Sequence, residues 1–223
     1  LAVTPVADMQ DTLRITEVCY SLQGETRTAG LPTVFIRLTG CPLRCGYCDS
    51  AYAFSGGTVR PLEDILEQVA SYRPRYVCVT GGEPLAQPNA IPLLTQLCDA
   101  GYEVSIETSG ALDISAVDPR VSRVLDLKTP GSKESHRNLY ENIALLTSND
   151  QVKFVICSRD DYDWAVSKLI EYGLERRAGE VLFSPSHHDL SARDLADWIV
   201  ADNLPVRLQM QLHKYLWNDE PGR

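Results

Sequence analysis

Three cysteines lie within eight residues of one another, in the segment Cys41-Pro-Leu-Arg-Cys45-Gly-Tyr-Cys48. Thiolates this close can converge on one metal centre, and they favour zinc, copper(I) or an iron–sulfur cluster. A structural zinc site normally has four protein ligands, and no nearby His or Cys has the usual spacing for a fourth. A four-iron cluster held by three cysteines leaves one iron open to a small molecule. We therefore expect a 4Fe–4S cluster on Cys41, Cys45 and Cys48, with a zinc-stabilised binding module as the non-enzymatic alternative.

A second group of small and polar residues, Thr80-Gly81-Gly82-Glu83-Pro84, follows a short apolar run. Two glycines let the backbone approach a ligand closely, and a glutamate can accept hydrogen bonds from an ammonium group. A Gly-Gly pair after a strand is most often only a turn. Downstream of the cysteine triplet, it indicates a ligand site.

Apolar runs alternate with amphipathic stretches along the chain, and these elements must position the site. Strands are predicted at 33–38, 76–79, 103–106, 123–125, 152–156, 180–183 and 206–212, and helical periodicity at 61–69, 91–97, 139–146, 164–170 and 191–199. Such alternation implies parallel strands with right-handed crossovers. About six strands before the last run are too few for an eight-stranded barrel. We predict an α/β fold, an incomplete TIM-like barrel of about six parallel strands, as one domain over 1–223 with its core at about 17–216.

Polar or glycine-rich clusters follow nearly every predicted strand. They lie at 41–48, 80–84, 107–110, 126–129, 184–186 and 213–214. Active sites of parallel α/β proteins gather at the carboxyl ends of the strands. The clusters therefore predict one site at that end of the sheet.

The composition narrows the class of protein. Hydrophobic residues make up 44% of the 223 residues, and 21 Lys and Arg against 30 Asp and Glu give a formal net charge of −9. An acidic chain is poorly suited to nucleic acid, because phosphate binding needs clustered cations. The sequence contains no run of 18 apolar residues, so we expect no membrane partner. Residues 1–10 show no signal-peptide pattern. Four other cysteines, at 19, 78, 98 and 157, are expected to be buried packing residues, and a reducing cytoplasm is the expected location.

The cysteine triplet, with aromatic Tyr47 before its last member, resembles the signature of the radical S-adenosylmethionine (SAM) enzymes. In that superfamily the open iron chelates the methionine part of SAM, and one electron from the cluster releases a 5′-deoxyadenosyl radical. The protein holds the reacting groups together and excludes water. The SAM contacts that the resemblance implies are Tyr47, Asp49, Gly82, Glu83, Glu107, Ser109, Asp126, Leu127, Lys128, Ser184 and Pro185.

Four further segments are similar to the 7-carboxy-7-deazaguanine synthase family. They are 21–25 (Ser-Leu-Gln-Gly-Glu), 35–41, 107–110 and 211–216, and the likeness extends from about residue 17 to 216. That family converts 6-carboxy-5,6,7,8-tetrahydropterin to 7-carboxy-7-deazaguanine in queuosine biosynthesis. The resemblance implies a carbon–nitrogen lyase that abstracts hydrogen at pterin C6, releases ammonia and regenerates SAM. It also implies magnesium, a homodimer and a one-electron donor such as a flavodoxin or ferredoxin.

The same resemblance assigns the substrate pocket residue by residue. Arg37 is expected to pair with the substrate carboxylate, and a structural ion pair with a buried Asp or Glu is its alternative. Ser50 stands where the family often has Thr as a magnesium ligand, and it retains the hydroxyl. The other implied substrate contacts are Leu22, Gln23, Gly24, Thr80 and His213.

Two questions stay open at this level. A glycyl-radical activase, or another small radical SAM enzyme, would share the cysteine triplet but leave Gln23 and Arg37 without an obvious role. An acidic electron donor would need a basic patch near the cluster, for which Arg27, Arg44 and Arg60 are candidates.

Overall fold

Nine strands form one sheet in the computed structural model, which describes residues 11–218 and 220. The strand order is β3-β1-β2-β4-β5-β6-β7-β8-β9. Their bounds are β1 (Thr12–Leu22), β2 (Pro32–Leu38), β3 (Thr58–Pro61), β4 (Tyr76–Gly81), β5 (Glu103–Thr108), β6 (Ser122–Asp126), β7 (Gln151–Ile156), β8 (Glu180–Pro185) and β9 (Arg207–Leu208). The interval 1–10, and with it the predicted lack of a signal peptide, lies outside the described residues.

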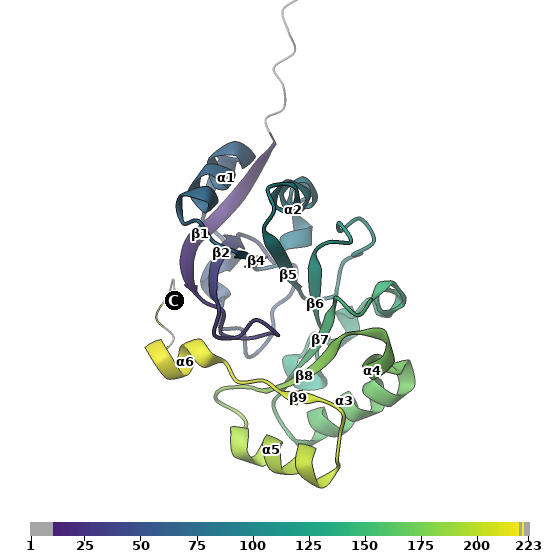
Figure 1. Cartoon of the computed structure of the whole chain (residues 1–223). Helices are drawn as coiled ribbons and strands as arrows, with labels where there is room; N and C mark the ends of the chain where they lie inside the picture. Colours follow the sequence, from purple (N-terminus) through teal and green to yellow (C-terminus); the bar gives the residue numbers. More distant parts are fainter. Residues whose placement is uncertain (1–10, 219, 221–223) are drawn as a thin grey trace, which may run out of the picture.

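The strands β2 and β4 through β9 pair in parallel, and they curve around a common interior (Figure 1). Alternate side chains face the helices on the outside, and many of these are completely buried, as in Val34, Ile36 and Leu38 of β2. Because β9 has only two residues, six strands make up most of the parallel region. The prediction of an incomplete barrel is confirmed.

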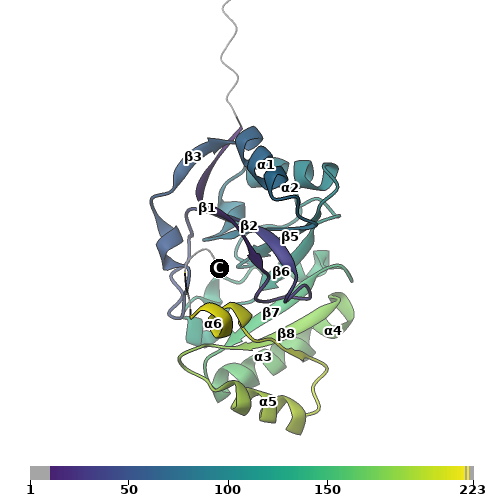
Figure 2. The ribbon, with the colours of Figure 1, turned by 60° about the vertical axis from the view of Figure 1, so that its left-hand side comes forward.

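Helices cover the outer face of the sheet, except for α6, which lies over the open side of the barrel (Figure 2). They are α1 (Leu62–Ser71), α2 (Ala90–Asp99), α3 (Arg159–Tyr172), α4 (Leu174–Arg177), α5 (Ala192–Ala201) and α6 (Leu212–Trp217). Ser158 caps α3 by accepting a hydrogen bond from the Asp161 N–H, and Gly173 ends it in the left-handed conformation. In the described residues, every helix is too short or too polar to serve as a membrane span.

Three predictions about the elements are wrong. The antiparallel strands β1 and β3 were not expected, although β1 is the longest strand and buries Leu13 and Ile15. The stretch 139–146 forms a 3₁₀ helix, η5 (Tyr140–Leu145), instead of an α-helix. The alternating run at 206–212 supplies only the short strand β9, after which the chain turns into α6.

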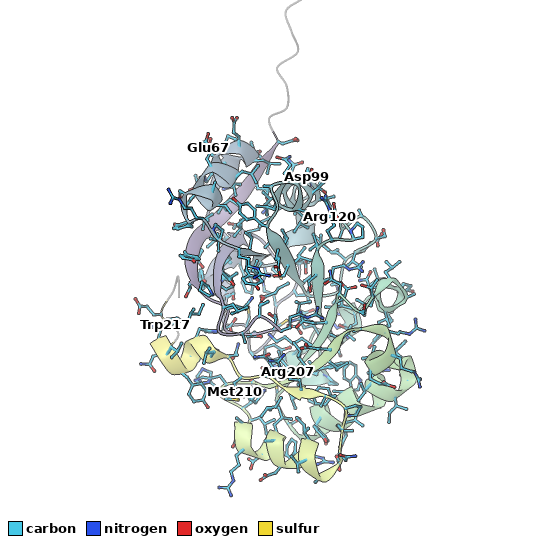
Figure 3. The ribbon with its side chains drawn as sticks, viewed as in Figure 1. Glu67, Asp99, Arg120, Arg207, Met210 and Trp217 are labelled. Atoms are coloured by element: carbon cyan, nitrogen blue, oxygen red, sulfur yellow. The ribbon has the colours of Figure 1, made fainter. Side chains whose placement is uncertain are left out.

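A complete barrel would have further strands between its first and last strands. In this chain, two segments cover that open side instead. One follows β1, and the other joins β9 to α6. The Gln209 N–H donates to the Phe183 carbonyl, and the Leu212 N–H donates to the Gly24 carbonyl. Figure 2 shows α6 between the β1–β2 ribbon and the β7–β8 ribbon, and Figure 3 places Met210 and Trp217 along this segment. The barrel is closed by loops and one short helix instead of by strands.

Candidate active site

The carboxyl ends of the strands surround a cavity of about 520 Å³. Side chains from β1, β2 and β4 through β7 line it, together with the cysteine loop and the segment that precedes α6. Several polar and charged side chains therefore face one enclosed space. This arrangement matches the single site predicted from the clusters after the strands.

The cysteine loop, 41–48, directly follows β2 and folds by short local contacts. The Cys48 N–H donates to the Cys45 carbonyl at 3.2 Å, and the Leu43 N–H donates to the Cys41 Sγ at 3.4 Å. Leu43 is buried and anchors the loop, while the three cysteines line the cavity. All three are free thiols.

Burial raises the pKa of all three thiols. Burial raises the pKa of Cys45 to about 11; Lys128 lowers it, whereas Asp126 and the other two cysteines raise it. Neutral thiols must lose protons to become metal ligands, and a bound iron cluster supplies the positive charge that favours this loss. The cavity wall can therefore hold a cluster on three thiolates.

A cluster fits this geometry better than zinc. Within the described residues, no three His, Cys, Asp or Glu side chains are placed to hold a single metal ion. A zinc site needs its ligands to converge on one atom, whereas a cubane binds each thiolate through a different iron. Three cysteines on one loop match the ligand count of a cubane with one open iron, and the described residues do not form the four-ligand site that a structural zinc needs.

The Gly81-Gly82 pair brings the end of β4 against the cysteine loop. Gly81 has φ +143°, and a Cβ on Gly82 would collide with the Gly40 carbonyl oxygen. The Gly82 N–H donates to the Leu38 carbonyl, and the Glu83 N–H donates to the Gly40 carbonyl. The pair is required for close backbone packing beside Cys41, and both glycines line the cavity.

Two residues that line the cavity next to the cysteine loop each hold a buried polar atom without a partner in the described part of the chain. The Tyr47 hydroxyl and Asp126 Oδ1 are buried and have no hydrogen-bond partner among the described residues. Asp126 also pairs with the buried Lys128 at 3.0 Å, and the Lys128 Nζ lies 5.7 Å from the Tyr47 ring centroid. Burial alone would lower the pKa of Lys128, but Asp126, Tyr47 and Cys45 raise it well above its ordinary value. These groups offer donors and acceptors to a polar cofactor.

A second polar group lies deeper in the barrel. Glu107 accepts hydrogen bonds from Gln23 Nε2 at 3.3 Å and from the Thr80 hydroxyl at 3.0 Å. Leu22, Gly24 and His213, the other predicted substrate contacts, line the same cavity. Glu107 was expected among the SAM contacts, and the structure instead groups it with the predicted substrate contacts.

Arg37 forms the structural ion pair that was its alternative, and it also lines the cavity. Its Nε donates to Glu17 at 2.6 Å, and Glu17 also accepts from the Tyr52 hydroxyl at 2.9 Å. The terminal guanidinium nitrogens have no hydrogen-bond partner in the described part of the chain, and Arg37 lines the cavity. Glu17 thus orients a guanidinium whose free edge can receive an anion.

Four predicted SAM contacts do not line the cavity: Glu83, Leu127, Ser184 and Pro185. Glu83 is completely buried, and its two oxygens accept from the Leu85 N–H, the Thr108 hydroxyl, and the N–H and hydroxyl of Ser109. Its carboxylate is saturated, so it positions Ser109, which does line the cavity. Leu127, Ser184 and Pro185 are packed into the sheet, and residues 186–189 reach the cavity in place of the last two.

Ser50 and Asp49 lie at the mouth of the cavity. The Ser50 hydroxyl donates to Asp49 at 3.0 Å, and Asp49 also receives Gln211 Nε2 at 3.0 Å and pairs with Lys214 at 3.4 Å. Burial opposes ionisation of Asp49, but Lys214 and Lys153 lower its pKa to about 2. Hard oxygen ligands suit magnesium, and the Ser50 hydroxyl is available at this edge as one of them.

Several cavity residues were missed by the sequence analysis. Lys153 points inward from β7 and forms a buried ion pair with Glu25, which in turn accepts from Gln211 at 2.9 Å. A lysine in the apolar run Val-Lys-Phe-Val-Ile was the available signal, because its side chain shares the inward face with Val155. Cys19, expected as a packing residue, also lines the cavity.

Comparisons with known proteins agree with this geometry. The model of the radical SAM superfamily matches residues 35–199. A 7-carboxy-7-deazaguanine synthase from Chlorobaculum tepidum is 41% identical over 93% of this chain and 96% of its own length. One from Koribacter versatilis is 40% identical over 93% of this chain and 98% of its own length. The chain belongs to the 7-carboxy-7-deazaguanine synthase family.

Family membership settles the class of chemistry. The family consists of radical SAM enzymes, which use a 4Fe–4S cluster and SAM, and the three cysteines of the cavity fit that cluster. The crystal structure of QueE from Escherichia coli has the same fold, with a TM-score of 0.75 and 24% identity over 91% of this chain and 95% of that one. The relatives argue against a glycyl-radical activase.

Proposed function

We propose that this enzyme converts 6-carboxy-5,6,7,8-tetrahydropterin to 7-carboxy-7-deazaguanine with loss of ammonia. The observation that carries the proposal is the shared cavity: Cys41, Cys45 and Cys48 line one part of it, and the Gln23–Glu107–Thr80 group lines another. A radical generated from SAM must meet its substrate at short range. One cavity with both sets of groups meets that requirement.

The groups beside the cysteine loop are suited to hold SAM. When bound, the cluster supplies one electron to SAM and so generates the radical. Tyr47 and Asp126 offer the unpartnered hydroxyl and carboxylate oxygen for the nucleoside part, and Lys128 offers a cation for a carboxylate. Glu83 fixes Ser109 and the end of β5 through hydrogen bonds.

The deeper groups are suited to a carboxylated, nitrogen-rich bicycle. The Arg37 guanidinium, oriented by Glu17, faces the cavity as a partner for the substrate carboxylate. Glu107 is an acceptor, and Gln23 is both a donor and an acceptor, which is the mixture that the edge of a pterin ring requires. Both side chains are held in place by the hydrogen bond between them.

The segments at the open side cover this cavity. Gly24 packs directly against His213, and a Cβ at Gly24 would overlap the imidazole. Gln211 donates to both Glu25 and Asp49 and so joins the segment after β1 to the end of the cysteine loop. A closed, dry site protects a reactive radical from side reactions.

The proposal includes the remaining family properties. Ser50 is the residue offered for magnesium, the active form is a homodimer, and a one-electron donor protein reduces the cluster. A cytoplasmic location suits an oxygen-sensitive cluster and free thiols, since reducing compartments keep cysteines unpaired. Each of these stands as a proposal for this chain.

The direct test is an anaerobic assay. Protein reconstituted with iron and sulfide is reduced with dithionite and incubated with SAM, Mg²⁺ and 6-carboxytetrahydropterin. We expect 7-carboxy-7-deazaguanine by mass spectrometry in amounts that exceed the SAM consumed, together with ammonia. A fully loaded protein that binds SAM but makes no deazapurine would contradict the proposal.

A further inference from the structure

The outer face of the cysteine loop is exposed, while its inner face lines the cavity. Pro42, Arg44 and Gly46 are exposed, and they alternate with Cys41, Leu43 and Cys45, which are partly or fully buried. One layer of backbone therefore separates solvent from the thiols that hold the cluster. A protein that delivers electrons would have its shortest route to the cluster through this layer.

The loop after β6 extends this face. The Gly46 N–H donates to the Ser132 carbonyl at 3.1 Å, and the Arg44 N–H donates to Glu134 Oε1 at 2.6 Å. The segment 130–137 therefore lies directly beside the cysteine loop. Pro130, Gly131 and Lys133 are exposed on it, so that small residues and cations share the surface.

The charge of this surface differs from that of the chain. The whole chain carries a formal net charge of −9. The segments 42–46 and 130–137 hold three cations, Arg44, Lys133 and Arg137, against one carboxylate, Glu134, which the Arg44 N–H already occupies. Most Lys and Arg side chains of the described residues form ion pairs with Asp or Glu, whereas these three form none.

The contacts of Arg44 hold its guanidinium beside the cysteine loop. Its Nη1 donates to the carbonyls of Cys41 and Leu43, and its guanidinium lies 4.3 Å from the Phe54 ring centroid. The other two cations from the sequence analysis are used elsewhere. Arg27 donates to the carbonyls of Ser148 and Asp150, and Arg60 donates to Gln68 and to the carbonyl of Asp64.

We infer that the face formed by 42–46 and 130–137 is the docking surface for a small acidic one-electron carrier protein. This inference rests on the proposed function, because it assumes a cluster that must be reduced. The carrier docks by charge complementarity, loses one electron, and the cluster gains it. Exposed Pro and Gly residues let the carrier approach the backbone over the thiols, and the cations steer it.

The test uses the reconstituted holoenzyme and reduced flavodoxin, an acidic flavoprotein, as the probe. Lys133→Glu/Arg137→Glu reverses the charge of the surface without touching the cavity. The matched control, Arg176→Glu/Arg177→Glu, makes the same change on α4, whose two arginines are also exposed. Dithionite, which needs no docking, reports whether each variant is intact.

We expect Lys133→Glu/Arg137→Glu to slow flavodoxin-supported turnover by about tenfold or more at low ionic strength. Its turnover with dithionite should equal that of the unmodified enzyme, and Lys133→Gln/Arg137→Gln should be intermediate with flavodoxin. Calorimetric titration of oxidised flavodoxin should give a matching loss of affinity. Equal flavodoxin affinity in the charge-reversed variant and the control would overturn the docking surface. Binding lost in that variant alone, in an enzyme that makes no deazapurine with dithionite, would support the surface and contradict the proposed reaction.

Discussion

At the amino-terminal ends of the parallel strands, charged side chains pair with one another. Arg123 at the start of β6 binds Asp150 just before β7, and Arg120 binds both Asp99 and Asp118 (Figure 3). At the carboxyl ends, Tyr47 and Asp126 keep buried polar atoms without partners among the described residues. A saturated group stabilises the fold, whereas an unsaturated one costs free energy unless a ligand completes it. A buried atom without a hydrogen-bond partner also occurs at the amino-terminal end, at Arg27 Nε, but among the described residues the carboxyl ends combine such atoms with the cavity.

The largest expected effect is at the carboxyl end. Cys45→Ala removes one of three ligands, and we expect loss of the iron–sulfur absorbance and of all turnover. The chain should still fold, because the cysteine is only partly buried and makes no disulfide. Iron analysis, circular dichroism and the anaerobic assay measure these three properties. Cys98→Ala, in α2 and away from the cavity, is the control and should keep both iron and activity.

The corresponding change at the amino-terminal end is Asp150→Asn. Asp150 accepts from the Arg123 N–H and guanidinium and from Thr147, and the side chains of both ion-pair partners are almost inaccessible to solvent. Breaking a buried pair of this kind costs about 3 to 5 kcal/mol, so urea denaturation should show a loss of this order. KM values should not change at temperatures where the variant is folded. A variant with native stability would contradict the contrast between the two ends.

The same carboxylate predicts a pH dependence of stability. Burial raises the pKa of Asp150, but hydrogen bonds from Arg123 and Thr147 outweigh it and lower the pKa below its ordinary value. The stabilisation is therefore present above the pKa of the unfolded chain, about 4, and is lost as pH falls through the folded value. Acid unfolding of the native protein should show this loss, and Asp150→Asn should show less of it.

A smaller effect is expected at Glu83, which both stabilises the fold and positions a residue of the cavity. In Glu83, both carboxylate oxygens accept hydrogen bonds, from Leu85, Thr108 and Ser109. Glu83→Gln replaces one of these oxygens with an NH₂ group, which cannot accept them. A buried donor without a partner costs about 1 to 3 kcal/mol. We expect moderate destabilisation and about tenfold weaker SAM binding, which corresponds to about 1.4 kcal/mol. Unchanged SAM affinity would mean that Glu83 supports only the fold.

The last comparison is between a buried ion pair at the open side of the barrel and an exposed ion pair at the amino-terminal end. Lys153→Met breaks the buried pair with Glu25 across the open side, and we expect about a tenfold rise in the KM for the pterin. Arg75→Met breaks the exposed Arg75–Glu103 pair at the other end, which is worth at most about 1 kcal/mol. Its KM should stay native. In a double-mutant cycle, Glu25→Gln should add little to Lys153→Met.

The regular part of this molecule could be predicted from the sequence, and the closure of the barrel could not. Strands such as 76–79 (Tyr-Val-Cys-Val) are short apolar runs, and the clusters that follow the predicted strands locate the site. The strand β1 was missed because its second half carries Glu17 and Cys19 on the face toward the cavity. A strand that faces a cavity lacks the apolar pattern of one that faces a core. Contacts such as Lys153–Glu25 and Gln211–Asp49 join residues more than 120 positions apart, and no local pattern encodes them. The sequence could not show that Glu83 does not line the cavity, because a motif gives a residue type but not the direction of its side chain.

The proposed reaction requires that one cavity bring the SAM held at the three cysteines next to the carboxypterin. The most direct measurement uses 6-carboxytetrahydropterin deuterated at C6, with the reconstituted enzyme, SAM and dithionite. We predict that SAM recovered after turnover carries deuterium at its 5′ carbon, because the substrate hydrogen passes to the adenosyl group and SAM is regenerated. Recovered SAM without deuterium, while deuterated substrate is consumed, would contradict the account.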